Sequence, residues 1–433
     1  MGNVNGMTPQ EAAARAKEDS FTLAALAGET RDQALEAIAA ALTAQQTAIF
    51  AANAKDLEEG ADLPGPILGR LKFDEHKLES CLAGIRDLVA MEDPIGKTLL
   101  KRQLAAPEEN AGDSGLILEK VTCPIGVIGV IFESRPDALV QILALCLKSG
   151  NAVLLKGGSE AKHTNRALFD VIHEAGVKAG LPEAFATLVE DRAAITELLA
   201  CDDAIDLIIP RGSNAFVRYI MDNSRIPVMG HADGVCHIYV DKAADLEKAI
   251  PVILDAKTQY VAACNAVETL LIHKEIAPAL LPRLQEAAAR ADAATNGHPV
   301  TLIEAAGEED YVEYLDYKLT TRIVASLDEA IDHINRYGSH HTDAILTEDS
   351  EAAQRFMTRV DSAGVYQNCS TRFADGYRYG FGAEVGISTG KLHARGPVGL
   401  EGLLTYKYKI YGNGETVGAF SDGTRSFDFK DLQ

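Results

Sequence analysis

The chain has 433 residues, 47% of them hydrophobic, so it can form two domains with substantial cores and is not intrinsically disordered. Its formal net charge of −22 argues against nucleic acid or an anionic membrane as its main partner. Residues 1–8 lack the apolar core of a signal peptide, and apolar runs such as Ile125–Phe132 are too short to cross a bilayer, which predicts a soluble, cytoplasmic protein.

Helical patterns dominate the N-terminal part of the chain. Residues 8–59 are rich in Ala, Leu and Glu, and Thr8–Glu11 is typical of a capped helix start with proline at the first position. Residues 72–92 continue the helical pattern. Between residues 99 and 122, two alternating runs flank a polar, Gly-containing turn and predict a β-hairpin.

From about residue 125, short apolar runs alternate with helical segments. The first series of runs is Ile125–Phe132, Ala152–Leu155, Ala186–Val189, Ile205–Ile209 and His237–Val240. The second series is Thr269–His273, Arg322–Val324, Ala344–Thr347 and Val365–Tyr366. Such runs are typical of parallel sheets covered by helices, whose sites lie at the carboxyl ends of the strands. We therefore predict two α/β domains, the second beginning near residue 245.

The C-terminal segment, residues 403–433, contains the alternating strand pattern Leu403–Tyr411. We expect this strand and the 99–122 hairpin to pair with another subunit.

The segment Tyr260–His273 is the most informative for chemistry, because Cys264 stands there among small residues just before an apolar strand. Small neighbours let a carbonyl approach the sulfur, and a loop leaves backbone N–H groups available for an oxyanion. From spacing alone, a buried structural cysteine is the commoner explanation, and no histidine stands at a spacing that identifies a general base. Glu268 can equally be structural, with its carboxylate satisfied by backbone N–H groups.

The seven cysteines are scattered and form no CxxC pair, so neither a zinc ribbon nor a disulfide framework is suggested. We expect no metal site. Each cysteine is then either a small buried apolar residue or a reactive thiol.

The ends of three predicted strands carry residues that suit anionic groups. These residues are Lys156, Gly157 and Ser159 at the first end, Arg211, Gly212 and Ser213 at the second, and Arg135 at the third. A lysine or arginine beside a helix N-terminus suits a phosphate. Taken alone, however, each of these segments can equally be an ordinary strand-to-helix turn, or its basic residue can form a surface salt bridge. The G-x-G-x-x-G fingerprint is absent from these turns.

Basic residues also concentrate near the C-terminus, amid many glycines, and hint at an anionic substrate. They are Arg372, Arg378, Lys391, His393 and Arg395.

Several long segments, in order, resemble the aldehyde dehydrogenase superfamily, and specifically its branch that reduces acyl phosphates. The most specific are Cys123–Asp137, Ile209–Asn214, Ile226–Asp241, Ala263–Leu271, Ile334–Thr342 and Phe381–Pro397. The resemblance covers residues 10–415, nearly the whole chain. It implies a Rossmann-like cofactor domain, a second α/β catalytic domain and a small β oligomerisation flap.

The implied boundaries assign residues 1–98 and 123–244, completed by part of 376–402, to the NADPH-binding domain. Residues 245–375 would form the catalytic domain with Cys264. Residues 99–122 and 403–433 would form the oligomerisation elements.

The resemblance also implies roles for individual residues. Cys264 would be the nucleophile, with Asn265 assisting at the oxyanion. Cofactor contacts would come from Lys156, Gly157 and Ser159 at the adenosine ribose and its phosphate, from Arg211, Gly212 and Ser213 at the pyrophosphate, and from Glu384 at the nicotinamide ribose. From motif position, substrate contacts would come from Arg135, Asn368, Ser370 and Arg372.

Two departures from the hydrolytic members of the superfamily matter. Those enzymes carry a water-activating glutamate in a Glu-Leu-Gly-Gly motif, whereas the corresponding stretch here, Met229–Gly234, contains no glutamate. Their oxyanion-hole asparagine corresponds to Arg135, which we assign instead to the substrate's phosphate or carboxylate. A thioester on Cys264 would then survive until hydride or phosphate reaches it.

The activity implied is NADPH-dependent reduction of L-glutamyl 5-phosphate to L-glutamate 5-semialdehyde in proline biosynthesis. Glutamate 5-kinase would be the upstream enzyme, and a homo-oligomer is expected. Two alternatives stay open: a hydrolytic dehydrogenase of another aldehyde, and a non-catalytic nucleotide-binding subunit on the same fold.

Overall fold

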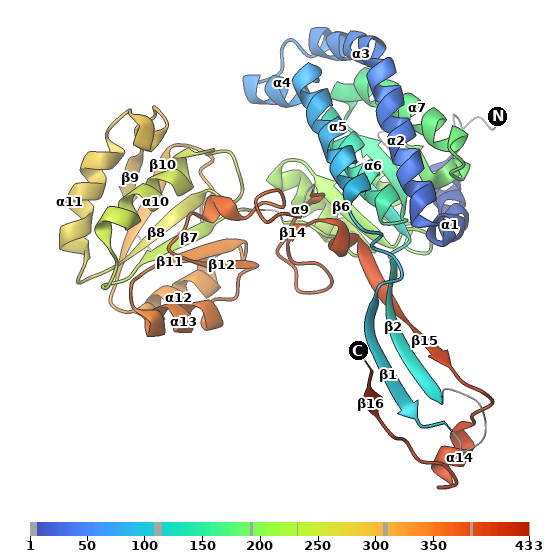
Figure 1. Ribbon diagram of the computed structural model, residues 1–433. Coiled ribbons are helices and arrows are strands. Elements are labelled where there is room, and N and C mark those ends of the chain that lie inside the picture. Colours follow the sequence, from blue (N-terminus) through green and yellow to red (C-terminus); the bar gives the residue numbers. More distant parts are fainter. Residues whose placement is uncertain are drawn as a thin grey trace. The chain divides into compact units, whose positions relative to one another are not determined.

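The computed structural model describes residues 7–107, 115–190, 194–231, 233–305, 311–381 and 384–432. The chain divides into two compact units, each built of helices and sheets as predicted for the α/β class (Figure 1). Unit 1 comprises Met1–Arg211, Asn223–Val228 and Gly399–Gln433, and unit 2 comprises Gly212–Asp222 and Met229–Val398. Residues 376–398 thus belong to unit 2.

The helical N-terminal region is confirmed. Its helices are α1 (Pro9–Ala25), α2 (Gly28–Ala44), α3 (Gln46–Glu59), α4 (Gly65–Leu71) and α5 (Glu75–Ala90). Thr8 caps α1: its hydroxyl accepts a hydrogen bond from the backbone of Glu11, and the Glu11 carboxylate accepts one from the backbone of Thr8. This reciprocal pair satisfies two amide donors that the helix itself cannot use.

The first sheet of unit 1 is parallel, with the strand order β5-β4-β3-β6. Its strands are β3 (Val127–Phe132), β4 (Ala152–Gly157), β5 (Ala186–Leu188) and β6 (Leu207–Arg211), with α6 (Pro136–Lys148), α7 (Lys162–Lys178) and α8 (Ala194–Leu198) between them. Every residue of β3 is buried, which explains why this strand is uniformly apolar rather than alternating.

A four-stranded antiparallel arm extends from the rest of unit 1 (Figure 1). It contains β1 (Thr98–Ala105), β2 (Leu116–Pro124), β15 (Leu404–Tyr411) and β16 (Lys430–Asp431), with α14 (Val417–Ser421) near its end. The 99–122 hairpin is therefore confirmed, although residues 108–114 of its turn lie outside the described residues. Strand β15 pairs with β2 of the same chain and forms an edge of this sheet, so the expected pairing of residues 403–411 with another subunit stays a prediction.

Unit 2 is built on a six-stranded parallel sheet with the order β12-β11-β7-β8-β10-β9. The strands are β7 (Cys236–Val240), β8 (Val267–His273), β9 (Thr301–Glu304), β10 (Lys318–Val324), β11 (Thr342–Leu346) and β12 (Gly364–Gln367). Two separate apolar clusters lie on its two faces, one with α10 (Leu246–Thr258) and α11 (Ala277–Ala288), the other with α12 (Leu327–Tyr337) and α13 (Ser350–Arg359) (Figure 1).

The strand predicted at His237–Val240 belongs to this second sheet, not to the first series. It lies between β8 and β11, so unit 2 already includes residues 229–244. An apolar strand pattern predicts burial in a parallel sheet, but it does not specify which of two sheets the strand joins.

Short elements complete unit 2: α9 (Asn214–Asn223), the turns η3 (Ala293–Thr295) and η4 (Thr371–Phe373), and the pair β13 (Gly386–Ser388) and β14 (Gly396–Val398).

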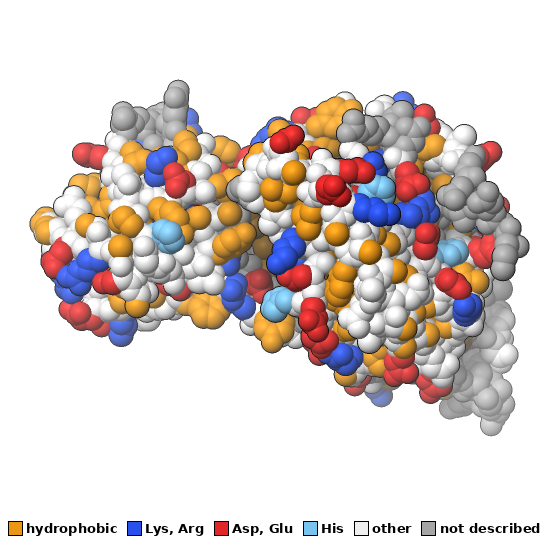
Figure 2. Space-filling view, turned by 90° about the horizontal axis from the view of Figure 1, so that it is seen from above, with side chains coloured by type: hydrophobic (Ala, Val, Ile, Leu, Met, Phe, Trp, Pro, Cys, Tyr) orange, Lys and Arg blue, Asp and Glu red, His pale blue; other side chains and the backbone are white. Residues whose placement is uncertain are grey.

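In the described part of the chain, no single helix is long and apolar enough to cross a membrane. Helices α2 and α3, which are bent by 67° relative to each other, pass this test of length and composition only when they are taken as a pair. Figure 2 shows basic and acidic side chains intermixed on the face that it presents.

Candidate active site

Cys264 lies in the turn directly before β8, as predicted, with its side chain half-buried. Gly234 packs against this turn so closely that a Cβ atom on it would come within 2.5 Å of the Cys264 Cα atom. Any larger residue at position 234 would therefore displace the cysteine. The thiol of Cys236 contacts the Cys264 carbonyl oxygen at 3.3 Å and fixes the same turn from another side.

His341 contacts the Cys264 thiol, and no sequence pattern predicted this contact. The Nε2 atom of the buried imidazole lies 3.2 Å from the sulfur, while Nδ1 lies 2.9 Å from the Thr342 hydroxyl oxygen. When Nδ1–H donates to Thr342, the lone pair of the neutral ring is on Nε2 and faces the sulfur. His341 is therefore placed to accept the thiol proton.

The two residues occupy the amino ends of parallel strands, because Cys264 precedes β8 and His341 precedes β11. The expectation that sites in such sheets lie at carboxyl ends is thus wrong for this pair. That expectation was taken from open, doubly wound sheets, in which ligands bind outside the carboxyl ends of the strands.

The remaining six cysteines are poor nucleophiles, because burial raises the pKa of each thiol and so disfavours the thiolate. They are Cys81, Cys123, Cys146, Cys201, Cys236 and Cys369. For Cys81 the pKa is raised to about 12.

Asn265 and Arg372 lie together beside Cys264. Asn265 donates from Nδ2 to the Ala374 carbonyl at 2.8 Å, and its Oδ1 accepts from the Arg372 guanidinium. Burial lowers the pKa of Arg372, the neighbouring Arg378 lowers it further, and the charge on Cys264 acts in the opposite direction.

Asn368 and Ser370 make structural contacts instead. The Asn368 side-chain amide accepts from the Thr347 backbone N–H and donates to the Thr347 carbonyl, both at 2.9 Å. The Ser370 hydroxyl caps η4 by accepting from the Arg372 backbone N–H at 3.3 Å.

The C-terminal basic cluster is largely paired with carboxylates. Lys391 and Arg395 both contact Asp361, and Arg378 contacts Asp375 and the Arg372 carbonyl. Much of its charge is thereby offset within the chain.

In unit 1, Lys156 and Gly157 end β4 as expected, and the buried Lys156 ammonium donates to the Gly157 carbonyl at 2.7 Å. The helical segment after β4 starts with the 3₁₀ turn η1 (Ser159–Ala161) and becomes α-helical from Lys162. The Glu160 carboxylate beside this turn accepts from the Ser134 backbone and hydroxyl at 2.6 and 2.8 Å.

The other predicted cofactor and substrate residues lie in turns. Arg211 ends β6, and the division between the two units falls directly after it, before the exposed Gly212 and Ser213. Arg135 is half-buried at the start of α6. The Glu384 carboxylate accepts from the Gly376 backbone N–H at 2.7 Å.

A buried ion pair joins α10 to β8, the strand that follows Cys264. The Lys257 ammonium lies 2.6 Å from the Glu268 carboxylate, and both side chains are fully buried. Burial raises the pKa of the Glu268 carboxyl to about 7, although the nearby Lys257 ammonium acts to lower it. Burial lowers the pKa of Lys257, because it disfavours the charged ammonium. The expectation that backbone N–H groups satisfy Glu268 is confirmed in part: the Leu315 N–H donates to it at 3.4 Å and the Tyr314 N–H also contacts it, but its closest partner is Lys257.

Replacing Lys257 by methionine should lower the free energy of unfolding by about 3–5 kcal/mol, because it leaves a buried carboxylate without its partner. The double variant Lys257→Met/Glu268→Leu should recover most of that loss. Urea unfolding of both variants measures the effect. Equal losses in the single and double variants would show that packing, rather than the unpaired charge, sets the cost.

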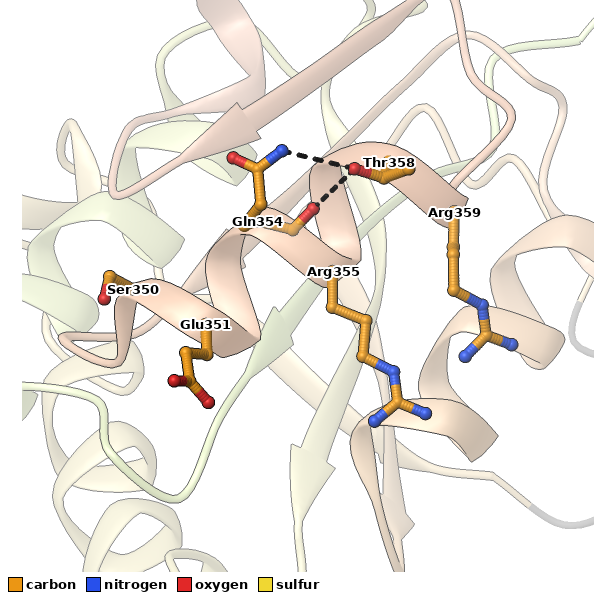
Figure 3. Close-up of a pocket in the computed structure, with 6 residues that line it drawn as sticks. All are labelled: Ser350, Glu351, Gln354, Arg355, Thr358 and Arg359. Atoms are coloured by element: carbon orange, nitrogen blue, oxygen red, sulfur yellow. Dashed lines mark hydrogen bonds between the residues drawn. The ribbon is translucent and has the colours of Figure 1, made fainter.

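A surface hollow of about 480 Å³ lies apart from these residues. All six lining residues belong to α13, where Arg355 and Arg359 extend along one side and Gln354 donates to Thr358 (Figure 3). Both arginines are already paired with Asp328, so the hollow has little unneutralised charge to offer an anion.

Comparison with known proteins gives a consistent result. Residues 4–303 match the family model of the aldehyde dehydrogenase family. The chain is 57% identical to a γ-glutamyl phosphate reductase of Pelotomaculum thermopropionicum, over 98% of both chains, and 55% identical to one of Acetivibrio thermocellus, over 97% of both. The crystal structure of γ-glutamyl phosphate reductase from Thermotoga maritima superposes with a TM-score of 0.89 at 36% identity, covering 95% of this chain and 100% of that one.

Proposed function

The chain belongs to the aldehyde dehydrogenase family, and we propose that it reduces L-glutamyl 5-phosphate to L-glutamate 5-semialdehyde, with release of phosphate, through a thioester on Cys264. The observation that carries the mechanism is the 3.2 Å contact between His341 Nε2 and the Cys264 sulfur. The relatives named for this activity are more than half identical to the chain over almost its full length. The chain is accordingly an oxidoreductase of proline biosynthesis.

In the first half-reaction, His341 accepts the thiol proton as the Cys264 sulfur attacks the acyl carbon. The C–O bond to phosphate breaks, phosphate leaves with the bonding electrons and takes a proton from solvent, and a thioester remains. Backbone N–H groups of the Cys264 turn, with the second amide N–H of Asn265, stabilise the oxyanion. Arg372, which donates to Asn265, would bind the anionic substrate beside Cys264.

The second half-reaction needs NADPH, which would be held by the strand-end turns described below and would supply the hydride that reduces the thioester carbon. The resulting hemithioacetal oxyanion collapses to the aldehyde and expels the Cys264 thiolate. The imidazolium of His341 returns its proton to the sulfur, so the site regains its starting state. The carboxylate of Glu268 takes no part, because it is buried against Lys257.

The cofactor residues are assigned from the family pattern. Lys156, Gly157 and Ser159 would bind the adenosine ribose and its phosphate, and Arg211, Gly212 and Ser213 the pyrophosphate. The turns fit these roles, since each follows a parallel strand and precedes a helix. The Glu160 carboxylate, held by Ser134, lies beside the first turn and is the feature that opposes a bound 2′-phosphate. We assign Glu384 to the nicotinamide ribose.

The substrate residues have unequal support. Arg372 is best supported, because it contacts Asn265 next to the nucleophile. Arg135 is assigned to the substrate's phosphate or carboxylate. Asn368 and Ser370 would act indirectly, since their side chains bind neighbouring backbone groups.

We further propose a homo-oligomer that assembles through the arm of unit 1. Strand β15 is an edge strand with exposed Tyr406, Tyr408, Ile410 and Tyr411, a surface typical of protein contacts.

The acyl phosphate must be supplied by a kinase acting on the glutamate side chain, which is the activity of glutamate 5-kinase. NADPH chemistry and seven free cysteines favour the cytoplasm.

Phosphate dependence of the reverse reaction tests this function. With glutamate 5-semialdehyde and NADP⁺, the enzyme should reduce one NADP⁺ per active site without phosphate and turn over continuously only with it. The same assay with NAD⁺ should be slower if Lys156 binds a 2′-phosphate. Continuous turnover without phosphate would instead identify a hydrolytic dehydrogenase.

A further inference from the structure

Three side chains with metal-binding atoms meet at the nucleophile. The nitrogen or sulfur atoms of His231, Cys264 and His341 all lie within 4.8 Å of one another. The two imidazole rings pack edge to face, with centroids 4.8 Å apart. The proposed reaction uses Cys264 and His341 and leaves His231 without a role.

The donor set and spacing suit zinc. Thiolate and imidazole are its preferred ligands, and bond lengths of about 2.3 Å and 2.0 Å place neighbouring ligand atoms of a tetrahedral site about 3.3–3.6 Å apart. The contact between His341 and the sulfur is already 3.2 Å, and no two of the three ligand atoms lie more than 4.8 Å apart, so they need to approach by at most about 1 Å.

The outer nitrogen of each ring is hydrogen-bonded in the manner of metal-bound histidines. His231 donates from Nδ1 to the Ile387 carbonyl at 2.8 Å, and His341 contacts the Thr342 hydroxyl through Nδ1 at 2.9 Å. The Ile387 carbonyl can only accept, so it fixes the proton of a neutral His231 on Nδ1 and the lone pair on Nε2; His341 presents the same lone pair when its Nδ1–H donates to Thr342. Cys264 and His231 are half-buried, which leaves solvent access to the cluster.

We propose that His231, Cys264 and His341 form a reversible Zn²⁺ site that masks the nucleophile and inhibits the enzyme. On binding, the Cys264 thiol releases its proton to solvent, a Zn–S bond forms, and water completes the tetrahedron without any change of oxidation state. The inhibitory consequence rests on the proposed role of Cys264, whereas the binding itself does not.

The test uses Co²⁺ as a spectroscopic substitute for Zn²⁺, with the reduced full-length enzyme and no nucleotide or substrate. Wild type should bind one Co²⁺ per chain with a sulfur-to-cobalt charge-transfer band and the visible spectrum of a tetrahedral site. His231→Gln should weaken binding at least about tenfold, because loss of even an outer-shell partner costs that much. Cys264→Ser should abolish the charge-transfer band.

Two matched controls share the chemistry but not the position. His340 directs its ring toward the Asp361 carbonyl, and Cys369 is another half-buried thiol, so His340→Gln and Cys369→Ser should bind Co²⁺ as wild type does. Circular dichroism verifies the fold of each variant. A second measurement on wild type needs no variant: Zn²⁺ should protect Cys264 from iodoacetamide, as mapped by peptide mass, and a chelator should reverse the protection.

A charge-transfer band that persists in Cys264→Ser, wild-type affinity in His231→Gln, or alkylation of Cys264 unaffected by Zn²⁺ would each overturn the site. Turnover of the chelator-treated enzyme tests the proposed function separately. Metal binding without turnover would reject the proposed function but support the zinc site. Turnover without metal binding would support the proposed function but reject the zinc site.

Discussion

Replacing Cys264 by serine should lower kcat for NADPH-dependent reduction by at least about a thousandfold, as expected when a covalent nucleophile is removed. The serine hydroxyl keeps its proton far more tightly than a thiol, so His341 cannot generate an effective nucleophile from it. Steady-state oxidation of NADPH with L-glutamyl 5-phosphate measures the loss. NADP⁺ binding, followed by fluorescence or calorimetry, should stay close to wild type.

Cys369→Ser is the matched control for this variant. Cys369 is also half-buried, but burial raises the pKa of its thiol, so it should contribute nothing to turnover. Full activity in Cys264→Ser together with loss in Cys369→Ser would overturn the assignment of the nucleophile.

Replacing His341 by asparagine should lower kcat by about 100- to 10,000-fold, the range typical of a positioned general base. Asparagine keeps a side chain of similar size but accepts no proton from the thiol. The rate at which iodoacetamide alkylates Cys264 should fall in parallel, because it reports thiolate formation without any substrate. A purely structural histidine would change kcat without changing the alkylation rate or its dependence on pH.

His340→Asn is the control for this second variant. The neighbouring histidine contacts the Asp361 carbonyl and not the sulfur, so both rates should stay near wild type. If the two variants behave alike, the 3.2 Å contact of His341 has no catalytic meaning.

Local sequence patterns predicted most of the elements that position the site. The capped helix at Thr8, the 99–122 hairpin and the strands around Cys264 all depend on neighbours in sequence, and all are present. Cys264, the proposed nucleophile, was singled out by its small neighbours and by the family resemblance rather than by spacing.

Contacts that depend on strand order could not be predicted. Cys264 and His341 are 77 residues apart and meet because β7 alone separates β8 from β11. The same dependence on strand order explains why the strand at His237–Val240 was predicted in the wrong sheet. No local pattern encodes which strands become neighbours, because apolar strands of a parallel sheet are interchangeable in composition. The short strand β9 was missed because it is only partly buried at the edge of the sheet.

The partner of Glu268 was missed for a related reason. Lys257 is only 11 residues away, but it reaches the carboxylate because α10 packs on the face of β8. A lysine at the end of an amphipathic helix is normally solvated, so its sequence position predicts exposure rather than burial.

The most direct test of the account is the mass of the enzyme after reaction with glutamate 5-semialdehyde and NADP⁺ in the absence of phosphate. The account predicts one glutamyl group per chain, located on Cys264 by peptide mapping and released when phosphate is added. Repeated reduction of NADP⁺ with no adduct, or an adduct on a different residue, would contradict it.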